Sequence, residues 1–338
     1  MTLRGAQAGC CLLALGVVLG TAGCAHPSTS HSARAATAAK AKAPAVRPPV
    51  PRQLTFRYFS GPVYYRHEVV VLMMHDITPH PQPYTDEITP ATFQGDLRSL
   101  RRDHFNVIPG SLFVSFMEHG ASVPPNAVLL TFDNGYQGLY TYGFPLLKRY
   151  HVPIMCLLIT GWVVHHEPWA MTWSELGRMY DSGLVDMQSQ TYNSHQGVQS
   201  GPGNTTGSAL TDRIYDPATG TYESKAHFRK RIGSDLAEAK RVLEAHFPGD
   251  RVNFLSYPFG AYDQTVIRVL RREGYRFAFT TWGGAATPYT NPFQIFRINT
   301  GTWRSTPTEL VGATRAAGVA MQAHPRYQSP SRVVPTWH

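Results

Sequence analysis

The order of apolar and polar positions predicts alternating strands and helices from Glu68 onward. Apolar runs of strand length lie at residues 69–74, 106–109, 127–132, 154–160, 184–189, 252–257 and 277–280, with a further candidate at 293–298. Segments with helical spacing or helix-start signals lie at residues 89–104, 111–119, 137–150, 172–183, 225–246 and 263–273, and a last helix starts near Thr306. About seven strands that alternate with helices are typical of a parallel sheet, open or closed into a barrel.

The chain is organised around residues 127–136. The run 127–132 is typical of a strand buried on both faces, and it ends at Asp133 and Asn134, where Gly135 permits a sharp turn. In parallel α/β proteins, ligands bind at the carboxyl ends of strands, and a carboxylate buried there is costly without a partner or a role. Asp133 could instead cap the following helix, as Asp and Asn often do. This stretch alone leaves both interpretations open.

Composition divides the chain into four parts, of which residues 1–24 are the first. Residues 25–52 are rich in Ala, Pro, Ser and basic residues, which predicts a flexible tether. Residues 53–318 carry the alternating pattern and form the predicted folded domain. Within this domain, residues 197–224 are polar, rich in glycine and longer than an ordinary connection, which indicates a functional or mobile loop. Residues 319–338 show no clear pattern, and we expect an irregular tail.

Residues 1–24 resemble a bacterial export signal of the lipoprotein type. Arg4 gives a positive start, residues 11–19 are apolar, and small residues at 21–23 precede Cys24. A membrane-spanning helix would need about 20 apolar residues, and this run is shorter and contains glycine. We therefore expect Cys24 to carry lipid and to anchor the protein on the outer face of the cell membrane, at the cell surface.

The net charge of +9 is concentrated near the N-terminus. Six of the 31 Lys and Arg residues and none of the 22 Asp and Glu residues lie in residues 1–52, which leaves 25 basic against 22 acidic residues for the rest. A folded part so close to neutral gives little support to nucleic-acid binding. The basic tether fits attraction to an anionic surface, such as a membrane or cell wall.

Four polar or aromatic groups follow predicted strands and would meet if the strand ends converge. They are Asp133 with Asn134, residues 189–195 (SQTYNSH), residues 256–262 (SYPFGAY) and residues 281–284 (TWGG). The aromatic residues in them are most simply core or turn residues, but in a cleft they would also stack on sugar faces. The candidates for substrate binding are Tyr257, Phe259 and Trp282, together with His75 and Asp76 at the end of the first strand.

Three of these groups resemble the motifs of the polysaccharide deacetylases, which are the NodB-homology or carbohydrate esterase family 4 enzymes. Residues 131–136 (TFDNGY) resemble the family signature T-F-D-D-G-Y, residues 189–195 resemble S-H-T-x-x-x-H, and residues 257–263 (YPFGAYD) resemble Y-P-F/Y-G-x-Y-D. The order of these motifs, with His75 and Asp76 before them, is most similar to the poly-N-acetylglucosamine deacetylase branch. The resemblance extends over roughly residues 66–300.

The resemblance implies a distorted (β/α)7-type barrel that removes N-acetyl groups from an N-acetylated polysaccharide. In this family a divalent metal, zinc or similar, polarises the amide carbonyl and activates water. By the resemblance, Asp133 would be the catalytic base, and backbone N–H groups near Tyr136 would stabilise the oxyanion. Asn134, Gln190 and His195 would stand at the three metal-ligand positions.

Two of the three ligand positions are substituted. The second Asp of the signature is Asn134 and the first histidine is Gln190, so only His195 keeps its ligand type. Zinc prefers imidazole, thiolate and carboxylate ligands, so we expect metal binding to be weak or absent. Residues 165–167 (HHE) could supply replacement ligands, although a solvated loop is the simpler interpretation. Near residues 297–299 the sequence also lacks a histidine for the family's general acid.

Two functions of different classes remain open. The first is a polysaccharide N-deacetylase-like hydrolase that acts on the carbon–nitrogen bond of N-acetylhexosamine polymers, with Asp133 as base and altered metal dependence. The second is a catalytically inactive glycan-binding or cell-wall and exopolysaccharide assembly protein on the same scaffold, which the substituted ligands suggest. A nucleic-acid binder is a poor third. The sequence does not determine the polymer, its linkage, the oligomeric state or the role of residues 197–224.

Overall fold

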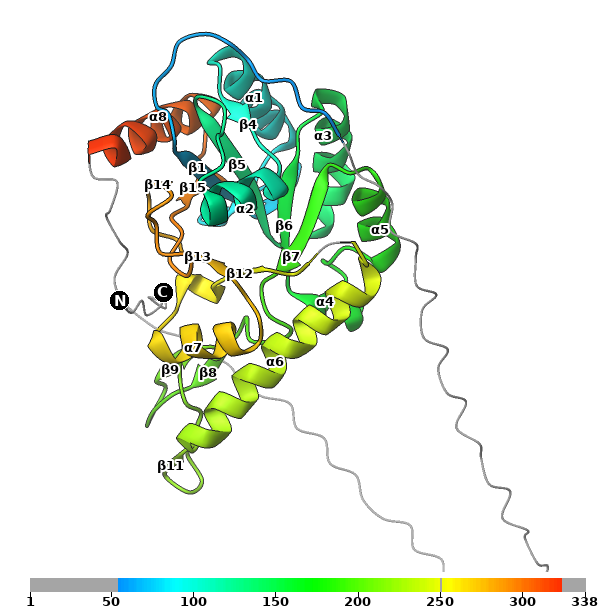
Figure 1. Cartoon of the computed structure of the whole chain (residues 1–338). Coiled ribbons are helices and arrows are strands. Elements are labelled where there is room, and N and C mark those ends of the chain that lie inside the picture. The colour runs from blue at the N-terminus through cyan, green and yellow to red at the C-terminus, as the bar shows by residue number, and fades with distance from the viewer. Residues whose placement is uncertain (1–53, 250, 324–338) are drawn as a thin grey trace, which may run out of the picture. The chain divides into compact units, whose positions relative to one another are not determined.

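A curled, mainly parallel sheet runs through the described chain, residues 54–249 and 251–323, in this computed structural model (Figure 1). Its spatial order is β13-β12-β7-β6-β5-β1-β14, with β15 beside β1 and β4 beside β5. Among these pairs, β1 with β14 is antiparallel and the rest are parallel. The strands are β1 (Val69–Met74), β4 (Asn106–Val107), β5 (Ala127–Asn134), β6 (Ile154–Leu158), β7 (Val185–Ser189), β12 (Phe254–Ser256), β13 (Phe277–Phe279), β14 (Ala285–Ala286) and β15 (Ile298–Asn299).

The central strand β5 is buried along its whole length, as its sequence predicts. Its side chains alternate between two cores. Leu130 and Phe132 belong to the larger core beneath the helices, whereas Ala127 and Leu129 belong to a smaller core inside the curl of the sheet. Because successive side chains of a strand point to opposite faces, Asp133 continues the inner row.

A short irregular segment links the two edges of the sheet. Ile295 forms a parallel bridge with Phe279 of β13, and three residues later Ile298 pairs with Leu72 of β1. The sheet therefore curls into the distorted barrel that the sequence predicts. Where the sequence suggested a further strand at residues 293–298, the chain pairs with both neighbours in turn, and its regular part, β15, is only two residues long.

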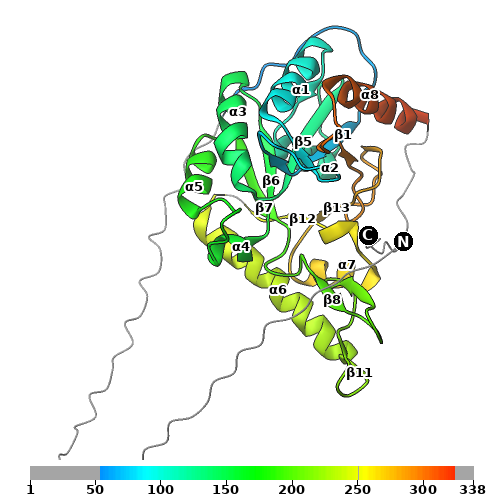
Figure 2. The same ribbon diagram turned by 180° about the vertical axis from the view of Figure 1, so that it is seen from behind.

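Apart from α2 (Gly110–His119), the helices pack along the outside of the sheet (Figures 1 and 2). The helices are α1 (Pro90–Arg102), α2 (Gly110–His119), α3 (Phe144–Tyr150), α4 (Thr160–Val164), α5 (Trp173–Asp181), α6 (Lys225–His246), α7 (Gln264–Arg272) and α8 (Pro307–Ala323), with a π-helical turn η1 (Leu139–Gly143) before α3 and a 3-10 turn η2 (Pro258–Gly260) after β12. Thr172 and Glu175 form a capping box at α5, and the Asp263 side chain caps α7.

Helix α2 packs against the inner core instead of lying on the outer layer. The Phe113 ring stacks on Phe254 of β12 and Phe279 of β13, at centroid distances of 6.0 and 6.2 Å. Since α2 follows β4 and packs on the inner rows of β12 and β13, apolar side chains fill the inside of the curl. Beyond this apolar filling, the inward-facing polar groups around Asp133 lie at the carboxyl ends of the strands.

Residues 197–224 are more ordered than the predicted loop. They form two hairpins, β8 (Gly197–Gln199) with β9 (Thr206–Ser208) and β10 (Tyr215–Asp216) with β11 (Thr221–Tyr222). Arg231 of α6 holds them: its Nη1 donates to the Ala209 carbonyl at 2.6 Å, and its Nη2 pairs with Glu223 Oε2 at 2.9 Å. Another small pair, β2 (Asp76–Ile77) with β3 (Glu87–Ile88), lies beside the end of β1.

The last helix extends further than the sequence pattern suggests. Helix α8 continues to Ala323, so the first five residues of the predicted irregular tail are helical. The reason is packing: Gly318 lies so close to the Tyr65 ring that a Cβ atom would collide with it, and Met321 is buried. The expected signal, Cys24, the tether and residues 324–338 lie outside the described residues. In the described part of the chain, no helix combines the length and apolar character needed to cross a membrane.

Candidate active-site cleft

A cleft of about 620 Å³ opens at the carboxyl ends of β1, β5, β7 and β12. The structure brings nine of the predicted site residues together in its lining: His75, Asp76, Asp133, Asn134, Tyr136, Gln190, His195, Tyr257 and Phe259. Trp282 is not part of this lining, although its neighbour Thr281 is. The Trp282 backbone instead accepts a hydrogen bond from the Arg297 N–H at 2.9 Å, which makes Trp282 a support of the irregular segment.

Asp133 lies at the bottom of the cleft in a fully hydrogen-bonded setting. Its side chain is 2% exposed, and Arg297 donates from Nη1 to Oδ1 at 2.7 Å and from Nη2 to Oδ2 at 2.9 Å. The Ser256 hydroxyl also donates to Oδ2 at 2.6 Å. Burial alone would raise the pKa of Asp133, but the Arg297 guanidinium, helped by His75 and Ser256, holds it below its ordinary value. Asp133 is therefore a stable carboxylate. Its side chain is held by Arg297 and Ser256, so the helix-cap interpretation does not describe its contacts, whereas a carboxylate buried at this strand end does have the partner that its burial requires.

Arg297 is the main residue that the sequence analysis missed. It comes from the segment that links β13 to β1, and it is fully buried. Its Nε donates to the Thr280 carbonyl at 3.0 Å, and its Nη1 also donates to Thr131 Oγ1 at 3.2 Å. The available signal was physical: a carboxylate predicted on the inner face of a buried strand needs a cation, and Arg297 lies in the one apolar segment that could close the barrel.

The chain leaves β5 through a left-handed turn. Asn134 has a φ of 72°, which asparagine tolerates better than most residues, and Gly135 follows at 89°. A Cβ atom on Gly135 would collide with the Leu158 side chain, so glycine is needed there. Around Tyr136, a bridge to Ala170 fixes the backbone. The role of the Tyr136 N–H as an oxyanion donor stays a prediction.

The side chain of Gln190 is turned toward the protein. Its Oε1 accepts the backbone N–H of Asn134 at 2.7 Å, and its Nε2 lies 3.5 Å from Asp133 Oδ2. The oxygen that could have ligated a cation is thus committed to the backbone, and an NH₂ group, which cannot ligate a cation, faces the carboxylate. Asn134, 5% exposed, leaves its own Oδ1 without a hydrogen-bond partner among the described residues.

His195 has a neutral imidazole in this setting. Burial lowers the pKa of His195 to about 4, against a smaller opposing effect of Asp133. The imidazole ring packs 4.4 Å from the Phe259 ring, and the loop before it is anchored by Asp235, whose carboxylate accepts the backbone N–H groups of Tyr192 and Asn193 at 2.9 and 2.8 Å. His195 can therefore accept or donate one hydrogen bond, or offer one nitrogen to a ligand.

The three predicted ligand positions do not fit a tightly bound divalent metal. One offers an imidazole nitrogen (His195), one a neutral amide oxygen (Asn134), and one a committed amide (Gln190). Residues 165–167 do not line the cleft, and they add no ligand to it. Within residues 54–249 and 251–323, no group of three or more His, Cys, Asp or Glu side chains is placed to hold a metal ion. No chemical step is therefore assigned to a metal here.

The aromatic candidates divide into structural and exposed residues. Tyr257 is fully buried, stacks on Tyr262 at 4.8 Å, and donates its hydroxyl to the Phe293 carbonyl at 3.0 Å. Phe259 is 37% exposed and adopts a φ of 57°, a strained conformation for a phenylalanine. That turn holds the Phe259 ring at the cleft beside His195. Of the two, Phe259 is the residue placed to contact a ligand.

One wall of the cleft is acidic, and the sequence analysis identified only part of it. His75 and Asp76 are joined there by Glu87, the first residue of β3, and by Asp86 just before it. The His75 Nδ1 atom lies 3.8 Å from Asp86 Oδ2. Burial, and then the neighbouring Glu87, raise the pKa of Asp76, whose Oδ1 accepts the N–H of Ile77 at 2.8 Å. The cleft thus combines a deep neutralised carboxylate with an anionic wall.

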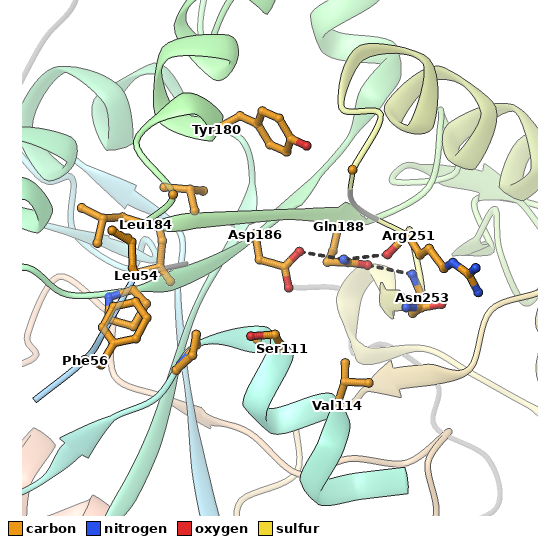
Figure 3. Close-up of a pocket in the computed structure, with 17 residues that line it drawn as sticks. Leu54, Phe56, Ser111, Val114, Tyr180, Leu184, Asp186, Gln188, Arg251 and Asn253 are labelled. Atoms are coloured by element: carbon orange, nitrogen blue, oxygen red, sulfur yellow. Dashed lines mark hydrogen bonds between the residues drawn. The ribbon is translucent and has the colours of Figure 1, made fainter. Parts of the chain in front are cut away.

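A second cavity, of about 510 Å³, lies at the opposite end of the sheet, beside the starts of β6 and β7 (Figure 3). The Gln188 side chain there joins Asp186 to the chain entering β12, with hydrogen bonds to Asp186 Oδ1 at 2.8 Å, the Arg251 carbonyl at 3.1 Å and the Asn253 N–H at 2.9 Å. The Asp186 carboxylate also abuts Gly110 in the first turn of α2. These contacts hold elements together, and no predicted site residue lines this cavity.

Comparison with known proteins agrees with the geometry of the first cleft. A family model described as polysaccharide deacetylase matches residues 120–278, which include the strand ends at Asp133, Gln190 and Tyr257. This chain carries a polysaccharide deacetylase domain. The predicted family and barrel fold are thereby confirmed.

The most informative relatives are deacetylases of one polysaccharide. The chain is 33% identical over 184 residues to the poly-beta-1,6-N-acetyl-D-glucosamine N-deacetylase of Escherichia coli (strain K12). This match covers 49% of this chain and 27% of that protein. The chain is 25% identical over 214 residues to the enzyme of the same name from Staphylococcus epidermidis, covering 62% of this chain and 67% of that protein. The chain thus spans about a quarter of the length of the Escherichia coli relative.

A solved structure shows the same architecture. The BpsB deacetylase domain from Bordetella bronchiseptica superposes with a TM-score of 0.62 at 28% sequence identity, and the match covers 69% of this chain and 95% of that domain. The likeness thus extends over more than two thirds of this chain and nearly all of that domain.

Proposed function

We propose that this chain is a polysaccharide N-deacetylase-type hydrolase that takes an N-acetylhexosamine polymer into the cleft at the ends of β1, β5, β7 and β12. The observation that carries the proposal is the placement of Asp133, His75 and His195 in one cleft of a polysaccharide deacetylase domain. The printed activity of the relatives supports the polymer class. The exposed ring of Phe259 gives the cleft a surface on which a sugar can stack.

In this proposal the reaction is slow, and its metal dependence is weakened or altered. Asp133 keeps its negative charge, but both of its oxygens accept charge-assisted hydrogen bonds from Arg297, so it is a weak base. His75 and His195 are titratable groups that lie near Asp133 in the cleft. Two amides in place of a carboxylate and an imidazole remove charge from the ligand set, which weakens the binding of a divalent cation.

The second candidate function is glycan binding without turnover, as in a cell-wall or exopolysaccharide assembly protein. One observation favours it: the Gln190 oxygen is committed to the Asn134 backbone, so the amide fills a ligand position with a hydrogen-bond donor. The sugar-binding features of the cleft do not depend on that position. The same experiment separates the two candidates.

The experiment measures zinc content, acetate release and oligosaccharide binding by the full-length chain and by the Asn134→Asp/Gln190→His variant. We expect the natural chain to hold much less than one equivalent of zinc and to release acetate slowly, and the variant to gain both zinc and rate. The rate of the natural chain should be lost in Asp133→Asn. Asn193→Asp/Gln196→His is the matched control, because it makes the same changes at exposed neighbouring positions outside the cleft.

Three results would change the proposal. Stoichiometric zinc in the natural chain would contradict the weakened metal dependence. Oligosaccharide binding without acetate release would favour the second candidate. Neither binding nor release would refute both.

We also propose that Cys24 anchors the protein to the outer face of the cell membrane. The support is the sequence alone: an apolar run followed by small residues and a cysteine. Cys24→Ala should move the protein from the membrane fraction to the soluble exported fraction. An unchanged membrane fraction would refute the lipid anchor.

A further inference from the structure

The acidic wall of the cleft is formed by two strands whose pairing places like charges side by side. In the β2–β3 pair, Asp76 is in register with Glu87, and the Asp76 N–H donates to the Asp86 carbonyl at 3.4 Å. All three carboxylates line the cleft. Such crowding is unfavourable by itself, because each anion raises the energy of the others. A fold that keeps this arrangement at a binding cleft gains from it when the ligand is a cation.

Apart from His75, whose Nδ1 lies 3.8 Å from Asp86 Oδ2, the described residues supply little cationic charge to neutralise this wall. The buried Arg297 lines the cleft, but its Nη1 and Nη2 atoms are both committed to Asp133. The hydrogen bonds given to the wall come from neutral groups: Asn299 Nδ2 donates to Asp86 Oδ1 at 2.8 Å, and the Gln82 N–H donates to Glu87 Oε2 at 2.8 Å. The side chain of Asp86 remains 48% exposed toward solvent.

A separate observation points to the same kind of ligand. Asn134 is 95% buried, it lines the cleft, and its Oδ1 has no hydrogen-bond partner among the described residues. A buried acceptor without a partner is unfavourable unless a ligand supplies a donor. The nearby NH₂ group of Gln190 does not fill this role, because it faces Asp133. Besides the wall carboxylates, the cleft thus presents a buried free acceptor, which suits a ligand that carries N–H or O–H donors.

The rim beside the wall carries aromatic surface. Tyr84 is 88% exposed with a φ of 66°, and its ring meets the edge of the Trp303 ring at 5.5 Å. The Trp303 N–H donates to the Thr85 carbonyl at 3.0 Å, which ties this pair to the chain leading into Asp86. An aromatic platform next to carboxylates offers a sugar ring a stacking surface and offers an ammonium group both anions and π-faces.

We propose that the cleft recognises a hexosamine unit with a free, protonated amine, so that the preferred ligand is a partly de-N-acetylated polysaccharide. This inference rests on the proposed function, because it assumes that the cleft takes a hexosamine polymer. The ammonium lies against the wall of Asp86 and Glu87, while a neighbouring N–H or O–H of the sugar donates to Asn134 Oδ1. A bare metal ion is a poorer fit, since in the described part of the chain no three His, Cys, Asp or Glu side chains are placed to hold one together.

The test compares the affinity of the full-length chain for two hexosamine oligosaccharides of equal length and linkage, one fully N-acetylated and the other partly de-N-acetylated. We expect the de-N-acetylated ligand to bind about tenfold more tightly at low salt, with the preference shrinking as sodium chloride is added. In Asp86→Asn/Glu87→Gln the two affinities should come within about twofold of each other, with that for the N-acetylated ligand little changed. These substitutions keep the oxygens that accept from Asn299 and Gln82.

A matched control makes the same two changes elsewhere. Asp216→Asn/Glu238→Gln alters a hairpin turn and the surface of α6, neither of which lines the cleft, and should keep the preference. The single variants Asp86→Asn and Glu87→Gln should each lose part of it, which guards against misfolding of the double variant.

The possible binding results distinguish failure of this inference from failure of the proposed function. Equal affinities for the two ligands in the natural chain, or a preference that survives in Asp86→Asn/Glu87→Gln, would overturn this inference and leave the proposed function intact. Binding of calcium chloride alone that is lost in the double variant would overturn it in favour of a metal-ion site. Failure to bind either oligosaccharide would refute the proposed function as well.

Discussion

Two buried carboxyl groups of this protein, those of Asp133 and Asp96, lie in opposite electrostatic environments. Asp133 in the cleft is 2% exposed and accepts three charge-assisted or hydroxyl hydrogen bonds from Arg297 and Ser256. Asp96 on the inner face of α1 is 1% exposed, and neither of its oxygens has a partner among the described residues. The first carboxylate has its pKa lowered by its partner, whereas burial raises the pKa of the second to about 8.

The difference shows that burial by itself does not determine the charge state of a carboxyl group. A buried carboxylate stays ionised only where a fixed cation replaces the lost water, and otherwise it takes up a proton. At Asp133 this cation is the fully buried side chain of Arg297. At Asp96 no cation among the described residues replaces the water, so the raised pKa of about 8 keeps the group mainly neutral at neutral pH. The cleft is thus a place where the structure preserves a negative charge against its solvation cost.

Removing the arginine should make Asp133 resemble Asp96. Arg297→Met keeps much of the side-chain volume but leaves the carboxylate buried without its cation, which typically lowers the free energy of unfolding by about 3–5 kcal/mol. With its partner present, Asp133 contributes stability above its ordinary pKa, and this contribution is lost as the pH falls through its lowered value. In the variant the pKa should instead rise, so stability should fall as the pH increases. Urea denaturation of the full-length chain at several pH values measures both effects.

Arg297→Lys is the control for charge without the two-pronged geometry. A lysine supplies one cation but cannot donate to both carboxylate oxygens in the same plane, so we expect an intermediate loss of stability. A loss in Arg297→Met below about 1 kcal/mol would mean that water or another group reaches Asp133, and the contrast with Asp96 would then fail.

Much of the fold could be predicted because its signals are local. The apolar runs gave the strands, and Thr172 and Asp263 marked two helix starts that the structure confirms. The hairpins within residues 197–224 escaped prediction because strands of two or three polar residues carry no alternating pattern. The end of α8 was missed for a related reason, since Gly318 is normally a helix breaker and here serves close packing against Tyr65.

The candidate site was predicted where it depends on sequence motifs and missed where it depends on contacts. Asp133 and His195 could be placed at strand ends and are found together in the cleft. The direction of the Gln190 amide depends on the backbone N–H of Asn134, which no residue pattern reveals. Arg297 and the wall residue Asp86 come from segments outside the motifs, and only the closed barrel brings them to the cleft.

A smaller effect is expected for Asp96→Asn, which tests the other side of the comparison between Asp133 and Asp96. The quantity to follow is the free energy of unfolding as a function of pH. Because the folded state holds the Asp96 proton up to a pKa of about 8, against an ordinary value of 3.8, this group favours the folded state most below about pH 4 and progressively less as the pH rises to about 8. The free energy of unfolding of the natural chain should therefore fall over this range, and Asp96→Asn should remove on the order of 2 kcal/mol of that fall, because local opening of α1 limits the cost of ionisation.

Burial raises the pKa of Glu68 to about 7 as well, so Glu68→Gln tests for a second contribution over the same range. Denaturant melts of the two variants between pH 5 and about pH 9 give the measurement. An Asp96→Asn curve parallel to that of the natural chain would show that Asp96 is already ionised and has a partner, and buried carboxylates in this fold would then not divide into a paired and an unpaired kind.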